Sequence, residues 1–254
     1  MRRFLLIGGL ALLVGAAVAF AATGGTAARP ATTSYADAAQ RTLRAASQRF
    51  AVDVRITKDT RPVTLHVRGA SAPGALKIRL KMDDATQADG TVVPGMNGAI
   101  LIDGPFLYER APSGMILGKV RWLRLHIADL SPSSENLRNI HDLTPYALLR
   151  VLGEARMRPT GDPGVYSGRL AYDDPIVRNR LGALTGDIEF RNLRATVLVG
   201  TDGRVHRVRI TGRTADGSAM LRLQAYLYAF GLPVKVKPPA QGAFLDPKRE
   251  QLAN

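Results

Sequence analysis

The chain contains no cysteine among its 254 residues. Disulfides, thiol catalysis and thiolate metal ligands are therefore excluded, and so is attachment of a lipid to an N-terminal cysteine. Aromatic side chains are also few, at 6% of the chain, whereas hydrophobic residues make up 46%. These proportions predict a folded domain with a mainly aliphatic core rather than a disordered chain.

Acidic side chains are scarce relative to basic ones, with 21 against 35, and the net charge is +14. Such a charge favours anionic partners: nucleic acid, anionic lipid or acidic glycan. In "LKIRLKM", however, the basic residues alternate singly with apolar ones, and few aromatic rings are present to stack on bases. We predict no nucleic-acid partner. We expect a solvated sheet face on which Lys77, Arg79 and Lys81 are candidates for docking to an anionic membrane.

Familiar catalytic patterns are missing from the sequence. The histidines at 66, 126, 141 and 206 do not have metal-ligand spacing, and there is no Gly-x-Ser-x-Gly elbow, Ser-x-x-Lys pair or glycine-rich phosphate loop. The aspartate pairs at 83–84 and 173–174 lie at the ends of predicted elements, where aspartate commonly caps a helix or makes a turn. We predict a non-enzymatic protein without cofactor or metal, and an enzyme of unrecognised type stays as an alternative.

The N-terminus has the organisation of an export signal. Arg2 and Arg3 precede an uncharged run from Phe4 to Phe20, and Ala19-Phe20-Ala21 fits a cleavage site before Ala22. Residues 1–21 are therefore predicted to be a signal peptide. An uncleaved anchor is the alternative, because a run extended to Ala22 just spans the ~30 Å hydrocarbon core of a bilayer. Both alternatives predict an exported protein of the cell envelope, in the periplasmic space or outside the cell.

Beyond a flexible linker at residues 22–33, the pattern predicts one domain over residues 34–254. A helix is expected from Ser34 or Asp37 to about Gln48, and further short helices after Thr144 and Asp174. Between them, apolar residues alternate with polar ones, and Asp-Gly pairs mark hairpin turns. In the last predicted strand, Leu221 to Ala229 at odd positions form an aliphatic face, and Tyr226, Tyr228 and Phe230 fall on the other. The fold class is α+β, with a large curled antiparallel sheet and a few short helices closing its concave side.

The order of these elements resembles a known family. The segments "ILIDGPFLYERAP", "RWLRLHIADL", "LTPYALLRVLGEA" and the ending "GLPVKVKPP" are similar to those of the LolA-like superfamily, and within it to the LppX/LprG type of cell-envelope lipid carrier. The resemblance implies a half-barrel with an apolar cavity for acyl chains. Those carriers are usually lipoproteins, and this chain has no cysteine to acylate, so its tether would be the uncleaved N-terminal segment or absent.

If the sheet curls as the resemblance implies, residues of one strand parity line the cavity, with two leucines of the helix after Thr144 as part of its lid. This predicted lining consists of Val52, Val54, Leu65, Val67, Ile78, Leu80, Leu123, Leu125, Leu149, Leu152, Leu223 and Leu227. The predicted function is to hold an acyl-chain lipid or glycolipid and carry it within the envelope. Two alternatives remain: an envelope sensor or interaction domain that binds a protein partner on the same fold, and, for each lining residue, a place in an ordinary core.

Overall fold

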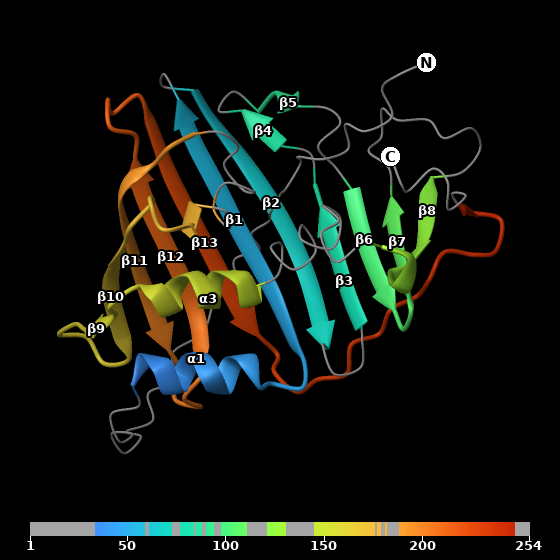
Figure 1. Ribbon diagram of the computed structural model, residues 1–254, viewed down its shortest axis with the longest axis horizontal. Coiled ribbons are helices and arrows are strands. Elements are labelled where there is room, and N and C mark those ends of the chain that lie inside the picture. The colour runs from blue at the N-terminus through green and yellow to red at the C-terminus, as the bar shows by residue number, and fades with distance from the viewer. Residues whose placement is uncertain are drawn as a thin grey trace.

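A computed structural model describes residues 34–58, 61–72, 77–83, 85–87, 90–93, 98–110, 121–130, 145–175, 177–178, 181 and 188–246. The predicted signal peptide and linker lie outside these residues. A single large, open sheet dominates the described part, with helices on one side of it (Figure 1). The expected fold class, α+β with a large sheet and few helices, is confirmed. None of the described helices is long and apolar enough to span a membrane.

The sheet is built mostly from antiparallel neighbours. Its strand order is β14-β8-β7-β6-β3-β2-β1-β13-β12-β11-β10-β9, and β4 joins β2 and β5 beside this path. The strands are β1 (Gln48–Lys58), β2 (Arg61–Ala72), β3 (Lys77–Met82), β4 (Ala85–Gln87), β5 (Val92–Val93), β6 (Gly98–Asp103), β7 (Phe106–Arg110), β8 (Trp122–His126), β9 (Arg158–Pro159), β10 (Val165–Leu170), β11 (Arg191–Val199), β12 (Val205–Arg213), β13 (Ala219–Tyr228) and β14 (Phe244–Leu245). The helices are α1 (Tyr35–Leu43), the 3-10 turn η2 (Ile127–Asp129) and α3 (Pro145–Glu154).

The Asp-Gly turns predicted from the sequence close three hairpins. Gly104, Gly203 and Gly217 have φ of 58°, 71° and 75°. Only glycine adopts such angles readily, since it lacks a Cβ. These turns join β6 to β7, β11 to β12 and β12 to β13. Gly90 also has a positive φ, of 82°, whereas its partner Asp89 lies outside the described residues.

Helix α1 begins where the sequence predicts but ends earlier. The Ser34 hydroxyl oxygen accepts a hydrogen bond from the Asp37 backbone N–H at 3.2 Å, which makes Ser34 the N-cap. The helix ends at Leu43 rather than near Gln48, because Gln48 already begins β1. Helix α3 begins at Pro145 as expected, with Thr144 outside the described residues, and the Asp174 carboxylate accepts from the Val177 N–H at 3.3 Å.

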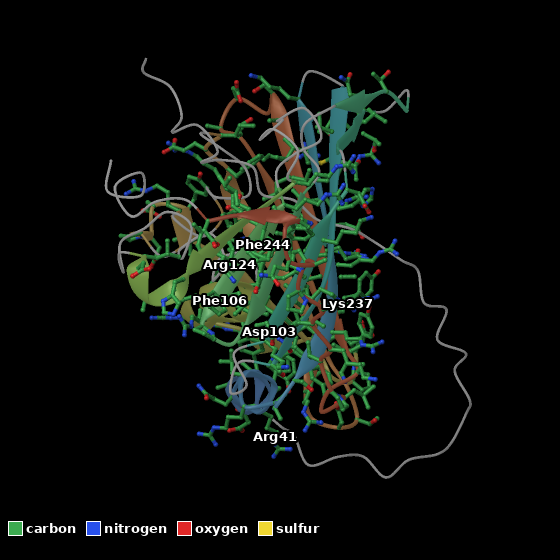
Figure 2. The ribbon with its side chains drawn as sticks, turned by 90° about the vertical axis from the view of Figure 1, so that its right-hand side faces the viewer. Arg41, Asp103, Phe106, Arg124, Lys237 and Phe244 are labelled. Atoms are coloured by element: carbon green, nitrogen blue, oxygen red, sulfur yellow. The ribbon has the colours of Figure 1, made fainter. Side chains whose placement is uncertain are left out.

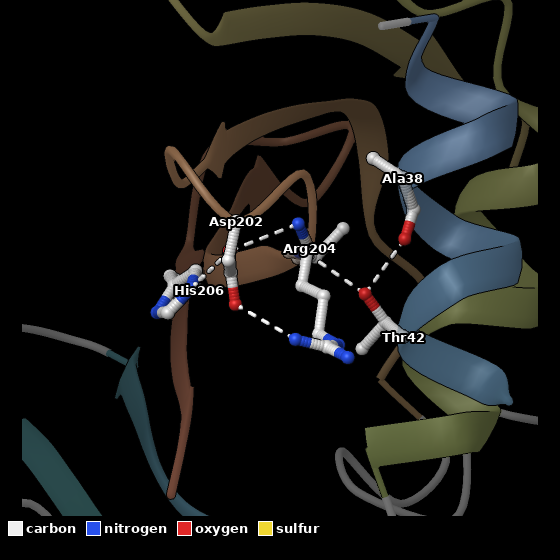
Figure 3. Close-up of polar contacts among 6 residues, drawn as sticks. Ala38, Thr42, Asp202, Arg204 and His206 are labelled. Atoms are coloured by element: carbon white, nitrogen blue, oxygen red, sulfur yellow. Dashed lines mark hydrogen bonds and ion pairs between the residues drawn. The ribbon is translucent and has the colours of Figure 1, made fainter. Parts of the chain in front are cut away.

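A buried threonine fixes α1 to the sheet (Figure 3). The Thr42 hydroxyl donates to the Ala38 carbonyl at 2.7 Å and accepts from the Val205 N–H at 2.8 Å. Beside it, Asp202 contacts His206 at 2.8 Å and the Arg204 side chain at 3.2 Å. Burial raises the pKa of Asp202, but the hydrogen bonds from His206 and Arg204 outweigh it and hold that pKa below its usual value. The turn after β11 is therefore ordered around α1.

The last long strand follows the predicted alternation as far as Tyr228. Its aliphatic face is buried, with Leu221 and Leu223 at 0% exposure. The expectation that the strand continues through Ala229 and Phe230 is wrong. Ala229 has a φ of 53°, which ends the strand, and the Phe230 ring packs edge-on against His206 at 5.3 Å. A left-handed alanine cannot be foreseen from alternation.

The sheet is mixed rather than antiparallel throughout, because the C-terminal segment returns to its far edge. There, β14 pairs with β8 in parallel. Arg124 donates two hydrogen bonds to the Asp246 carboxylate, both of 2.7 Å. Its guanidinium also lies 4.9 Å from the Phe106 ring centre and 4.4 Å from that of Phe244 (Figure 2). The ion pair and the cation–π contacts of Arg124 thus join segments that are 122 positions apart in the chain.

Candidate functional site

The two faces of the sheet differ in chemistry. We call the side on which α1 and α3 lie the inner face, and the opposite side the outer face. The inner face and the helices contribute to one continuous hydrophobic cluster, which runs from Tyr35 of α1 to Leu227 of β13. Nitrogen-bearing side chains project from the outer face, on the side of the sheet away from α1 (Figure 2). The sheet therefore has a buried apolar inner face and a basic outer face.

The sheet residues of the predicted lining all occupy the inner face. The register between neighbouring strands points their side chains to the same side of the sheet. The hydrophobic cluster contains most of them, together with Leu149 and Leu152 of α3. Cluster members among them are Val52, Val54, Leu65, Val67, Leu80, Leu125, Leu149, Leu152, Leu223 and Leu227. Ile78 packs against this cluster, and Leu123 is partly exposed on the same face. Their convergence on one face is thus a property of the fold.

The register arranges the inner face in rows that cross the strands. The row that we call the glutamate row consists of Leu227, Phe50, Gly69, Leu80, Ile100, Glu109 and Leu123. The next row, called the glutamine row, consists of Gln48, Ser71, Ile78, Ile102, Leu107 and Leu125. A Cβ at Gly69 would lie 2.1 Å from the Phe50 ring, so this glycine makes room for the aromatic side chain.

Two buried polar side chains interrupt the glutamine row. Gln48 and Ser71 are both 0% exposed and stand directly opposite each other on β1 and β2. Neither the Gln48 amide nor the Ser71 hydroxyl has a hydrogen-bond partner among the residues that the structure describes. Burying such a group without a partner costs about 1–3 kcal/mol, so native structures rarely keep one without a reason. The Gln48 amide nitrogen and oxygen and the Ser71 hydroxyl thus keep unused hydrogen-bonding capacity inside the apolar cluster.

A carboxyl group interrupts the glutamate row. Glu109 lies between Ile100 and Leu123 on the neighbouring strands. No hydrogen bond or ion pair joins its side chain to the described part of the chain, and burial raises the pKa of its carboxyl above the usual value. Low polarity disfavours the charged form, which is the cause of the shift.

Sequence reasoning missed Gln48, Ser71 and Glu109 as site residues. A signal was present, since each is a polar residue at a position whose neighbours two residues away are apolar or small. Gln48 precedes Phe50 and Val52 in this way, and Glu109 follows Leu107. All three are found by a search for polar residues at those alternate positions of a predicted strand that are otherwise apolar or small.

On the outer face, the predicted docking cations have different surroundings. Lys77 forms an ion pair with Asp103 at 3.2 Å, and Lys81 forms one with Asp83 at 2.5 Å. Arg79, between them in sequence, is exposed and has no ion pair within the described residues. Of the three, Arg79 therefore contributes the least compensated charge.

The described histidines have ordinary surroundings. His66 contacts Asp53 at 2.7 Å, His206 contacts Asp202, and His126 packs on the Phe106 ring at 5.4 Å. Across the ranges that the structure describes, no group of three or more His, Asp or Glu side chains is arranged to hold a metal ion. His141 lies outside those ranges.

Comparisons with protein-family models and with curated proteins give no significant match to this chain. The likeness to envelope lipid carriers therefore depends on the order of elements and residues alone.

Proposed function

We propose that the chain is a non-enzymatic, exported lipid-binding protein of the LolA-like, LppX/LprG type. In this proposal it holds acyl chains against the inner face and carries a lipid or glycolipid within the cell envelope. The observation that carries the proposal is the convergence of the predicted lining on one face, with Leu149 and Leu152 of α3 in the same cluster. The finer description of the fold, a half-barrel closed by helices, belongs to the same proposal.

The energetics of such binding are favourable. Burial of an acyl chain gains about 0.8 kcal/mol per methylene, so a chain of about sixteen carbons gains on the order of 10 kcal/mol before ordering costs. Lipid sites are mostly apolar and contain a few polar groups that fix orientation. Gln48, Ser71 and Glu109 supply such groups in this case, and the first two have unused hydrogen-bonding capacity. A ligand with ester, amide or hydroxyl groups next to its acyl chains fits this combination.

Delivery and collection of lipid require contact with a membrane. We propose that Arg79, with Lys77 and Lys81, docks the protein on an anionic bilayer. Residues 1–21 would direct export, either cleaved before Ala22 or retained as an anchor that substitutes for the acylated cysteine of the resembling carriers.

A second candidate is an envelope sensor or interaction domain on the same fold, with a protein partner and no transported lipid. The observation that favours it is the depth of burial of the lining. Val54, Leu152 and Leu223 are 0% exposed, as expected for residues packed in an ordinary core.

The two candidates differ in whether the purified protein takes up an acyl ligand. A fluorescent fatty acid should bind with one site per chain, show increased emission and be displaced by unlabelled phospholipid. The interaction domain would give no saturable signal at any protein concentration tested, and instead would retain an envelope protein after detergent extraction.

A further inference from the structure

A row of arginines crosses the outer face of the sheet. Arg55 of β1 lies directly opposite Arg222 of β13, and Arg194 of β11 lies directly opposite Arg169 of β10. Thr211 of β12 stands between the two pairs, opposite both Arg222 and Arg194. We call these five residues the arginine row. It extends over five neighbouring strands, and all four arginines are exposed.

The charges of the arginine row are not compensated within the described residues. None of the four guanidinium groups forms an ion pair there. Asp53, two residues before Arg55 and on the same face, is bonded to His66. Like charges directly opposite each other on neighbouring strands destabilise a sheet. Since folding alone is disfavoured by this arrangement, an anionic partner is the natural explanation for it.

The length and twist of the arginine row indicate which kind of anionic partner can contact all of it. Neighbouring strands are about 4.8 Å apart, so the row is about 20 Å long. Each strand is also rotated by about 20–25° relative to the next, so the side chains at the two ends point in quite different directions. A flat bilayer cannot face them all, whereas a flexible linear polymer can follow them.

The chemistry of the row narrows the choice further. The row itself contains no aromatic ring on which a nucleic-acid base would stack, and Tyr226 and Tyr228, which share the outer face of β13 with Arg222, are partly buried. The exposed large hydrophobic residues of the described chain are Val92, Leu232 and Leu245, and none belongs to these five strands. Guanidinium groups bind carboxylates through paired hydrogen bonds, and a threonine hydroxyl can bond to sugar hydroxyls.

We propose that the arginine row binds a linear acidic polysaccharide whose carboxylates repeat along the chain. The site lies on the face opposite the apolar one and does not depend on lipid binding. A protein with both surfaces would be retained on an acidic glycan while its inner face stays available.

The test is the affinity of the full chain for polygalacturonate at low salt, with neutral dextran as the negative polymer. The double variants Arg55→Gln/Arg222→Gln and Arg169→Gln/Arg194→Gln should each bind about tenfold more weakly or worse, because charge-assisted hydrogen bonds are lost. The control Lys235→Gln/Lys237→Gln removes the same charge from two exposed lysines of the C-terminal segment and should change affinity by less than about twofold.

Thermal unfolding of the same variants provides a second measurement. The arginine variants should unfold at the same or a higher temperature, since opposed like charges are removed. Equal weakening by the lysine control would show that only net charge matters and would overturn the proposal. Row-dependent binding that is tighter to anionic vesicles or to single-stranded oligothymidine than to polygalacturonate would overturn it as well.

Discussion

Gln48 and Ser71 face each other across β1 and β2 on the inner face, fully buried, and neither side chain forms a hydrogen bond within the described part of the chain. The pair is next to Ile78 in the same row, and so borders the predicted lipid-contacting surface. If these two side chains bind a polar group of a ligand, replacing both by apolar side chains should weaken ligand binding and leave the stability of the protein unchanged or raised.

The double variant Gln48→Met/Ser71→Ala tests this. Replacing unpartnered buried polar groups by apolar groups of similar shape is neutral or stabilising, so we expect stability to be unchanged or raised by about 1 kcal/mol. Binding of a fluorescent acyl ester should weaken. Both quantities are measured on one preparation, by urea unfolding and by fluorescence titration.

Ser47→Ala is the matched control for the Gln48/Ser71 variant. The Ser47 hydroxyl donates to the Leu232 carbonyl at 2.6 Å, so its removal should lower the stability of the protein by about 1 kcal/mol and leave ligand binding intact. Unaltered binding in the Gln48/Ser71 variant would mean that the pair does not contact the ligand.

Val54→Trp and Leu80→Trp test the apolar part of the inner face. A large ring at either buried position should occupy ligand space and abolish acyl-probe binding. An ordinary core would instead be overpacked and lose about 1–3 kcal/mol of stability, with no probe bound by the parent protein. Leu232→Trp is the control, since Leu232 is 52% exposed and follows the end of β13.

Glu109→Gln should change the dependence of stability on pH. Burial raises the pKa of Glu109 in the folded protein above the unfolded value of about 4.3, so the folded state binds the proton more tightly. The stability of the parent protein should therefore fall, relative to the variant, as pH rises from about 4.3 through the folded pKa. At neutral pH the variant should be the more stable, and below about pH 4 the two should agree. Urea unfolding across this range checks it, with exposed Glu189→Gln as the control; parallel profiles for Glu109→Gln and the parent would contradict the argument.

Arg79→Gln should weaken binding to anionic vesicles by about fivefold, because each basic charge near such a surface contributes about 1 kcal/mol. Lys81→Gln/Asp83→Asn removes an ion pair of zero net charge and should have little effect. Co-sedimentation with vesicles at increasing salt measures both, and binding that persists unchanged in high salt would count against electrostatic docking.

Local rules account for much of the fold. Alternation identified β1, β2, β3 and β13 and the face on which Val54 and Leu223 lie. Ser34 and Pro145 marked the starts of α1 and α3. These features depend on neighbours in sequence, which a single chain displays directly.

What could not be predicted depends on contacts between distant segments. The parallel pairing of β14 with β8 is accompanied by the ion pair between Arg124 and Asp246, 122 positions apart, and no local pattern encodes it. The opposition of Arg55 and Arg222 needs the register between β1 and β13. In the same way, alternation identifies Gln48 and Ser71 separately as polar residues on an apolar face, but only the register between β1 and β2 shows that they stand opposite each other.

The most direct test of the central claim is mass spectrometry of organic extracts from the purified full-length protein, recovered from exporting cells without added lipid or detergent. We expect a restricted set of acyl-chain lipids or glycolipids near one per chain, greatly reduced in Leu80→Trp. Extracts from parent protein that contain no lipid above the level of Leu80→Trp, while both proteins are folded, would contradict it.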